Sequence, residues 1–246
     1  MTDFSQEALE IASALGGLTY VIGALIYALP IPFRGLKDWG PTLMGDGIYV
    51  AFWTAFYSAI ISFVNQISPP WHSYLSWLYG TTAELGNLYT VVYGVSGVLA
   101  EYHINYAPLS LASFFLSSAA AIFLYLLSFS LLIYENWELF IVLGIMLMAI
   151  PFRIGRSAGA TLIAFAVVFY IGLPFFPTLN LNSVFSALAG SSSPESAIQQ
   201  SITNNIANFI FDGMAYFIVL ILASVTLADL IGNYSGKLPL GISVVF

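Results

Sequence analysis

The sequence predicts an all-α membrane protein whose chain crosses the bilayer several times. Hydrophobic residues make up 59% of the 246 residues, whereas Asp, Glu, Lys and Arg together make up only 7%. A soluble domain usually contains about a quarter charged residues. Several apolar stretches also reach the roughly 20 residues that a helix needs to span a membrane. These observations exclude a soluble fold, and we expect residues 1–246 to form a single integral membrane domain.

Seven membrane-spanning helices, arranged as a transmembrane helical bundle, are expected from the apolar stretches. The fifth of them, Trp137–Ile150, is short for a full crossing, but Arg153 just after it can extend its side chain toward water and lengthen the effective reach of the helix. The expected spans are Leu9–Leu29, Thr42–Val64, Glu84–Ala100, Ala107–Ile133, Trp137–Ile150, Ala158–Leu173 and Ile210–Ile231.

A basic turn that contains proline occurs twice between expected spans. Ile31–Arg34 is followed by Lys37, and Ile150–Arg153 is followed by Arg156, so the two turns hold four of the five cations. If the chain alternates sides at each span, both turns and the basic tail fall on the same side. Cytoplasmic loops are enriched in Lys and Arg. We therefore expect a plasma-membrane protein with its N-terminus outside and its C-terminus in the cytoplasm.

The similarity between the two halves extends beyond these turns. The same gapless alignment matches Gly40 with Gly159, and a second one matches Glu84 and Glu101 with Asp212 and Asp229 at equal spacing. This pattern predicts two parallel three-helix repeats with a pseudo-twofold axis along the membrane normal. The repeats cover about 9–101 and 137–231, and a linker helix at about 107–133 joins them. Gly159 also lies in a small-residue pattern that favours close packing within the chain.

Charged residues near the span ends are the candidate functional groups. Basic side chains in the turns could contact the phosphates of a polyanion, or they could simply fix the topology and bind lipid headgroups. Acids near or within spans could line a pore or couple transport to ions, or they could mark helix ends. The basic candidates are Arg34, Lys37, Arg153 and Arg156, and the acidic candidates are Asp46, Glu84, Glu101, Asp212 and Asp229.

Several other functions are disfavoured by what the chain contains. Its two histidines, His72 and His103, are too few and too far from mid-membrane for a hydrolytic metal centre or an intramembrane protease, and cysteine is absent. Its lysines, Lys37 and Lys237, fall in aqueous segments, which argues against a retinal receptor. The sequence contains no P-loop, so ATP-driven work requires another protein. We expect no enzymatic activity, no metal and no cofactor.

One segment carries a family resemblance. Pro151–Ala160, continued by Leu162–Phe165 and by Leu173–Pro174 with Pro177, resembles CedA, the polytopic membrane protein family of the archaeal DNA-import system. It is more distantly similar to the polytopic channel subunit of bacterial conjugative type IV secretion machines. The resemblance implies a channel subunit that oligomerises and takes up DNA across the plasma membrane. It also implies a HerA-like ATPase, CedB, at the cytoplasmic face and a small pilin-like membrane protein outside.

Two other classes of function remain open. A secondary transporter of a small solute would use Asp46 and the acids at span ends for coupling and would need no ATPase. A membrane scaffold would anchor an external filament through the loops at 65–80 and 174–208, of which the first is rich in aromatic residues. In the scaffold the basic turns would be replaceable, whereas in a DNA channel they would lie at the cytoplasmic mouth.

Overall fold

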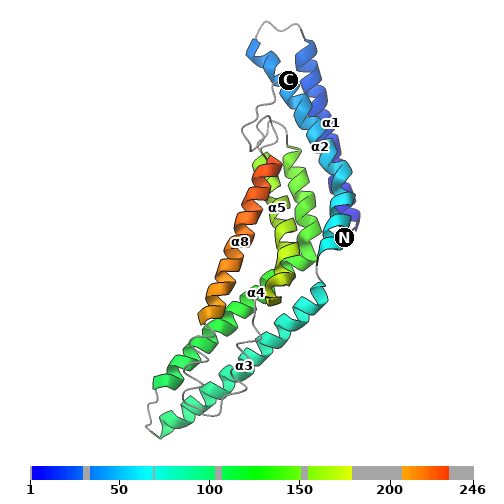
Figure 1. Cartoon of the computed structure of the whole chain (residues 1–246). Coiled ribbons are helices and arrows are strands. Elements are labelled where there is room, and N and C mark those ends of the chain that lie inside the picture. Colours follow the sequence, from blue (N-terminus) through cyan, green and yellow to red (C-terminus); the bar gives the residue numbers. More distant parts are fainter. Residues whose placement is uncertain are drawn as a thin grey trace. The chain divides into compact units, whose positions relative to one another are not determined.

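The computed structural model of the chain describes residues 2–29, 34–68, 70–102, 107–150, 155–178 and 207–232. Within these ranges it is all-α, with six α-helices and one short 3-10 helix (Figure 1). The helices are α1 (Thr2–Ala28), α2 (Arg34–Ile67), α3 (Trp71–Glu101), α4 (Ala107–Met148), α5 (Arg156–Gly172) and α8 (Ala207–Gly232), and the 3-10 helix η2 (Leu173–Thr178) follows α5.

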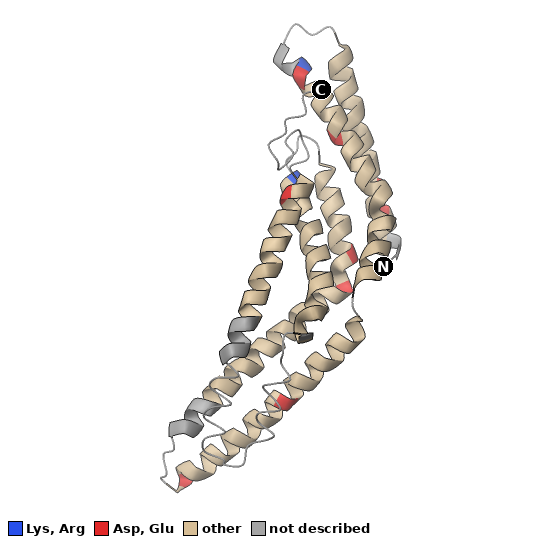
Figure 2. Ribbon diagram, viewed as in Figure 1, with Lys and Arg blue, Asp and Glu red and all other residues tan. Residues whose placement is uncertain are grey.

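Five of the described helices are long and apolar enough to cross a membrane. Charged residues are sparse along them (Figure 2). The expected all-α membrane class is confirmed at this level, although seven spans are not shown. The candidate spans are Phe4–Ala28 in α1, Lys37–Ile67 in α2, Ser113–Met148 in α4, Arg156–Pro177 through α5 and η2, and Gly213–Gly232 in α8.

Helix α3 differs from its expected form. The expected span Glu84–Ala100 is the second half of one helix that begins at Trp71. Most of the aromatic-rich stretch 65–80, which the sequence predicts to be a loop, is therefore helical. Polar residues recur along this helix, among them Ser76, Thr82 and Asn87, and α3 is not among the five apolar candidates.

Helix α4 corrects the expected boundary between the fourth and fifth spans. The sequence predicts a break between Ile133 and Trp137, but α4 continues without interruption for 42 residues. The break was wrong because Glu135 and Asn136 interrupt only the apolar run, and the segment contains neither glycine nor proline to end a helix. The expected linker helix and the start of the second repeat therefore lie in one helix, and the three-helix repeat remains a prediction from the sequence.

Glycines set the register between α1 and α2, which lie side by side as an antiparallel hairpin (Figure 1). A Cβ atom on Gly23 would lie 2.8 Å from the carbonyl oxygen of Gly40, and one on Gly47 would lie 2.7 Å from that of Gly16. Real Cβ atoms do not approach backbone so closely, so glycine at these positions allows the two helices to touch.

The two helices on either side of the second basic turn, α4 and α5, also touch through a pair of glycines. A Cβ atom on Gly144 of α4 would lie 2.7 Å from the carbonyl oxygen of Gly159 in α5, and Gly159 approaches Gly144 reciprocally. Gly159 is the residue that aligns with Gly40. Both copies of the turn are thus followed by a glycine that packs against a glycine of the preceding helix, as the expected close packing within the chain requires.

The helices divide into two compact units. The first comprises residues 1–68, 136–171 and 220–246, and the second comprises 69–135 and 172–219. An aromatic core holds the second unit together. In that core the Tyr74 hydroxyl lies 2.8 Å from the buried Ser130 hydroxyl, and Trp77 packs against Phe123 and Phe176 at ring-centroid distances of 6.1 and 6.2 Å.

Candidate functional site

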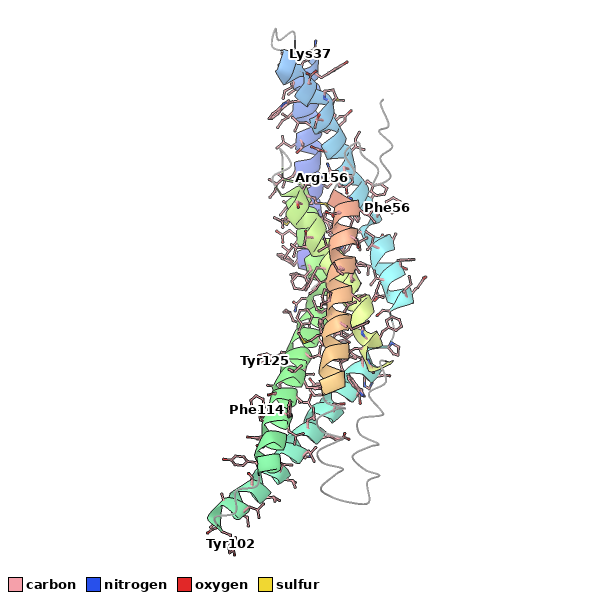
Figure 3. The ribbon with its side chains drawn as sticks, turned by 60° about the vertical axis from the view of Figure 1, so that its left-hand side comes forward. Lys37, Phe56, Tyr102, Phe114, Tyr125 and Arg156 are labelled. Carbon is pink, nitrogen blue, oxygen red and sulfur yellow. The ribbon has the colours of Figure 1, made fainter. Side chains whose placement is uncertain are left out.

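The basic residues singled out in the sequence fall in different surroundings. Lys37 is exposed near the start of α2, whereas Arg156, the first residue of α5, has only 8% of its surface exposed. Figure 3 shows Lys37 close to the end of the α1–α2 hairpin. It shows Arg156 at the start of α5, beside a later part of α2. The Arg34 side chain, Arg153 and Lys237 lie outside the described residues. The structure therefore does not bring Lys37 and Arg156 into one basic cluster.

Arg156 forms an ion pair with the first hairpin. Its Nη1 atom donates a hydrogen bond to Oδ1 of Asp46 in α2 at 3.0 Å, across 110 residues of sequence. Both side chains are largely buried, with 10% and 16% of their surfaces exposed. Removing one partner of a buried ion pair costs about 3–5 kcal/mol, because it leaves an uncompensated charge. The pair therefore holds the beginning of α5 against α2.

Tyr49 extends this contact to a third helix. Its ring lies one turn after Asp46, and the Arg156 guanidinium carbon sits 4.3 Å from the ring centroid, within the range of a cation–π interaction. The Tyr49 hydroxyl donates a hydrogen bond to the carbonyl oxygen of Ile231 at the end of α8. The last four carbonyls of a helix have no partner within it. Tyr49 thus caps α8 while it also covers Arg156.

We call Asp46, Tyr49, Arg156 and the Ile231 carbonyl the three-helix clamp. All of them belong to the first compact unit. The N-terminus of a helix carries a positive partial charge, which disfavours a cation such as Arg156 at the start of α5. Asp46 offsets this charge. The Nε atom of Arg156 is buried without a hydrogen-bond partner, so the guanidinium depends on Asp46 and the Tyr49 ring.

The remaining acidic candidates belong to other parts of the chain. Glu84 lies within α3, Glu101 ends that helix, and Asp229 lies in the last turn of α8; all three are exposed. The Asp212 side chain lies outside the described residues. Asp46 is thus the acidic candidate to which the structure gives a buried basic partner. Among the residues that the structure describes, no three His, Asp or Glu side chains are arranged to hold a metal ion.

Sequence reasoning did not identify Tyr49 or the Ile231 carbonyl. The spacing of Asp46 and Tyr49 places them on neighbouring positions of one helix face, which was the available signal in the sequence. A backbone carbonyl has no sequence signature, so the acceptor could not have been found in this way.

The clamp also defines how far the first hairpin extends. Because α5 begins beside Asp46 and α8 ends beside Tyr49, residues 34–45 of α2 continue beyond the ends of both helices. At 1.5 Å per residue this is a projection of about 18 Å. We call it, together with residues 17–28 of α1, the α1–α2 arm. Lys37, Trp39 and Tyr27 are exposed on it.

These features define the class of the protein. A chain whose described residues include five long apolar helices, glycine-packed helical hairpins and an ion pair between helices is a multi-pass membrane protein. Comparison with known proteins gives the family. A family model described as DNA import protein CedA1 matches residues 1–69, which contain α1 and α2.

A full-length relative extends this match to nearly the whole chain. DNA import protein CedA of Sulfolobus acidocaldarius is 31% identical over 246 residues, covering 94% of this chain and 95% of the relative. The chain belongs to the CedA family of DNA import proteins. No solved structure matches it. The family resemblance seen in the sequence is therefore confirmed.

Proposed function

We propose that this chain is the membrane channel subunit of a DNA-import apparatus and passes DNA across the plasma membrane. The observation that carries the proposal is the likeness to a DNA import protein over 94% of the chain. A transport role also accords with a chain made mainly of apolar helices. We infer that the cargo is DNA and that it moves inward because the relative is a DNA import protein.

Lys37 and Arg34 are the proposed phosphate contacts. Lys37 is exposed on the α1–α2 arm, beyond the ends of α5 and α8, where a polyanion can approach it. Contacts between Lys or Arg and phosphate are independent of sequence and weaken with salt, as a conduit for DNA of any sequence requires. Arg153 belongs to the corresponding second turn, and we propose the same role for it.

The span count supports the proposed orientation. If the five candidate spans cross and α3 does not, the turns at 30–33 and 151–154 and the tail with Lys237 all fall on one side. That side is cytoplasmic by the positive-inside rule, and the N-terminus lies outside. Five crossings thus give the same sidedness as the seven inferred from the sequence.

Partners complete the proposal. The chain contains no P-loop, so the energy for DNA movement comes from a separate protein, which we propose to be a HerA-like ATPase of the CedB type at the cytoplasmic basic turns. We further propose that several copies of the chain assemble around the DNA path and that a small pilin-like membrane protein contacts them outside.

The orientation can be tested by cysteine labelling, because the chain has no cysteine of its own. Single variants Thr2→Cys, Ser192→Cys and Ser235→Cys are treated in whole cells with a maleimide that does not cross membranes. We expect labelling of the first two in intact cells and of Ser235→Cys only after the membrane is opened. Labelling of all three in intact cells would contradict the odd number of crossings.

The function is tested by transfer of a selectable chromosomal marker into a strain that lacks this gene. The strain is complemented with the wild type, with Arg34→Gln/Lys37→Gln, or with the charge-preserving control Arg34→Lys/Lys37→Arg. We expect the neutral variant to lower transfer while its amount in the membrane stays normal, and we expect the control to restore transfer. Arg156 is left intact because its loss would disturb folding through Asp46. Undiminished transfer in the deletion strain would overturn the proposal and favour a solute transporter.

A further inference from the structure

The two copies of the basic turn place a base at the same aligned position, three residues after the Ile-Pro-Phe-Arg run. These bases are Lys37 and Arg156. We infer that these two aligned bases have different roles. Arg156 is a positioning residue that fixes the ends of α5 and α8 against α2, and Lys37 is left to contact the phosphate of the transported polyanion. The second half of this statement rests on the proposed function, whereas the first does not.

The two bases also differ in the residue that the other copy of the repeat offers as a partner. Asp46, the partner of Arg156, aligns with Phe165 in the second copy. Phe165 packs in an aromatic cluster, with ring-centroid distances of 6.3 Å to Phe140 and 4.6 Å to Phe169. The second copy therefore has an apolar contact where the first has a carboxylate, and it offers Lys37 no counterpart of the Asp46 ion pair.

The clamp satisfies two groups that each need a neighbour from another helix. Arg156 needs Asp46 because its charge is buried and stands at a helix N-terminus. The Ile231 carbonyl needs the Tyr49 hydroxyl because it lies in the last turn of α8. Tyr49 serves both, through its ring and through its hydroxyl. The contacts exist only while α2, α5 and α8 meet at this level.

The clamp determines where the arm begins. Lys37 lies nine positions before Asp46 in α2, which corresponds to about 14 Å along the helix. Fixing α5 and α8 at Asp46 and Tyr49 therefore sets the length of α2 that stands clear of both helices and holds Lys37 away from them. A role for Arg156 in contacting DNA is incompatible with its burial.

The position of the helix ends can be measured directly. A Cβ atom on Gly232 of α8 would lie 3.5 Å from that of Ala160 in α5, at the lower end of the 3.5–4.5 Å range found in disulfides. The double variant Ala160→Cys/Gly232→Cys introduces the only two cysteines of the chain. Its rate of disulfide formation in native membranes reports how closely the ends of α5 and α8 are held.

The test adds four changes to this cysteine pair: Asp46→Asn, Arg156→Gln, Tyr49→Phe, and the exchange Asp46→Arg/Arg156→Asp. We expect each of the first three to slow disulfide formation several-fold and to lower the melting temperature of the purified protein. We expect the exchange to recover much of both, because Asp at the start of α5 is favoured by the helix dipole. Tyr49→Phe keeps every charge and is the variant best able to fold.

The outcomes separate this inference from the proposed function. Unchanged crosslinking and melting in Asp46→Asn and Tyr49→Phe would overturn the clamp, whatever happens to DNA transfer. If Arg156 instead contacted DNA, Asp46→Asn would leave DNA transfer intact. The exchange Asp46→Arg/Arg156→Asp would then fail to restore the transfer that is lost in Arg156→Gln. If the clamp variants behave as expected but Arg34→Gln/Lys37→Gln transfers DNA normally, the proposed phosphate contact fails while the positioning role of Arg156 stands.

Discussion

Gly23 of α1 and Gly40 of α2 face each other backbone to backbone. A Cβ atom on Gly23 would lie 2.8 Å from the Gly40 carbonyl oxygen, and one on Gly40 would lie 3.0 Å from that of Gly23. The atoms in conflict are backbone atoms, which cannot rotate out of the way as a side chain can. The glycines therefore set the distance between the two helices of the arm.

Alanine at these positions should separate the hairpin. We expect Gly23→Ala and Gly40→Ala to lower the melting temperature of the protein in detergent, with a loss of stability of about 1–3 kcal/mol typical of overpacking. Gly17→Ala in α1 and Gly45→Ala in α2 are matched controls, because a Cβ atom on either would have nothing within 4 Å. Each control should be neutral or stabilising, since alanine favours helix more than glycine by up to about 1 kcal/mol. Equal effects in both pairs would rule out close packing as the cause.

Lysine is a stringent replacement for Arg156 because it keeps the positive charge. It can still pair with Asp46, but it lacks the planar guanidinium that lies over Tyr49. We expect Arg156→Lys to melt between the wild type and Arg156→Gln, with a loss of about 1 kcal/mol from the weaker cation–π contact. A variant as stable as the wild type would show that the contact with the Tyr49 ring adds nothing to the ion pair.

Tyr49→Phe isolates the hydrogen bond to α8. The ring remains beneath Arg156, and only the hydroxyl that caps the Ile231 carbonyl is removed. We expect a loss of about 1 kcal/mol, which is the usual net contribution of one such hydrogen bond. Thermal unfolding measures it. Tyr102→Phe, in an exposed residue at the end of α3, is the control and should leave stability unchanged.

Most of the membrane helices could be predicted because a long apolar run has few alternatives to a spanning helix. Helices α1, α2, α5 and α8 fall close to the expected spans. The sequence did not predict the continuity of α4 because Glu135 and Asn136 interrupt the apolar run, although polar residues alone do not end a helix. Composition thus located the apolar segments better than it located their ends.

The clamp could be predicted only in part. Asp46 and Arg156 were each singled out as charges near spans, but their pairing across 110 residues depends on how α2 and α5 pack. The match between Gly40 and Gly159 was visible in the sequence, whereas their glycine partners, Gly23 and Gly144, are not at aligned positions. Tertiary packing therefore supplied the contacts that the sequence patterns left open.

Tyr74 allows a test of the second compact unit through pH. It belongs to α3, outside the five candidate spans, and its hydroxyl lies 2.8 Å from the buried Ser130 hydroxyl. Burial raises the pKa of Tyr74 above its ordinary value near 10, because the charged phenolate is disfavoured away from water.

The sign of the pH effect follows from that raised pKa. The stability that neutral Tyr74 contributes is fully present below about pH 10, the pKa in the unfolded chain, and it is lost as the pH rises from there toward the folded pKa. We expect Tyr74→Phe to be about 1 kcal/mol less stable than the wild type at pH 8, because it lacks the hydrogen bond. Above about pH 10 this difference should shrink, since the variant has no phenol to deprotonate at this site. Melting curves of both proteins between pH 8 and 11 check this, and a difference that stays constant across the range would show that Tyr74 is not protected from water as the structure places it.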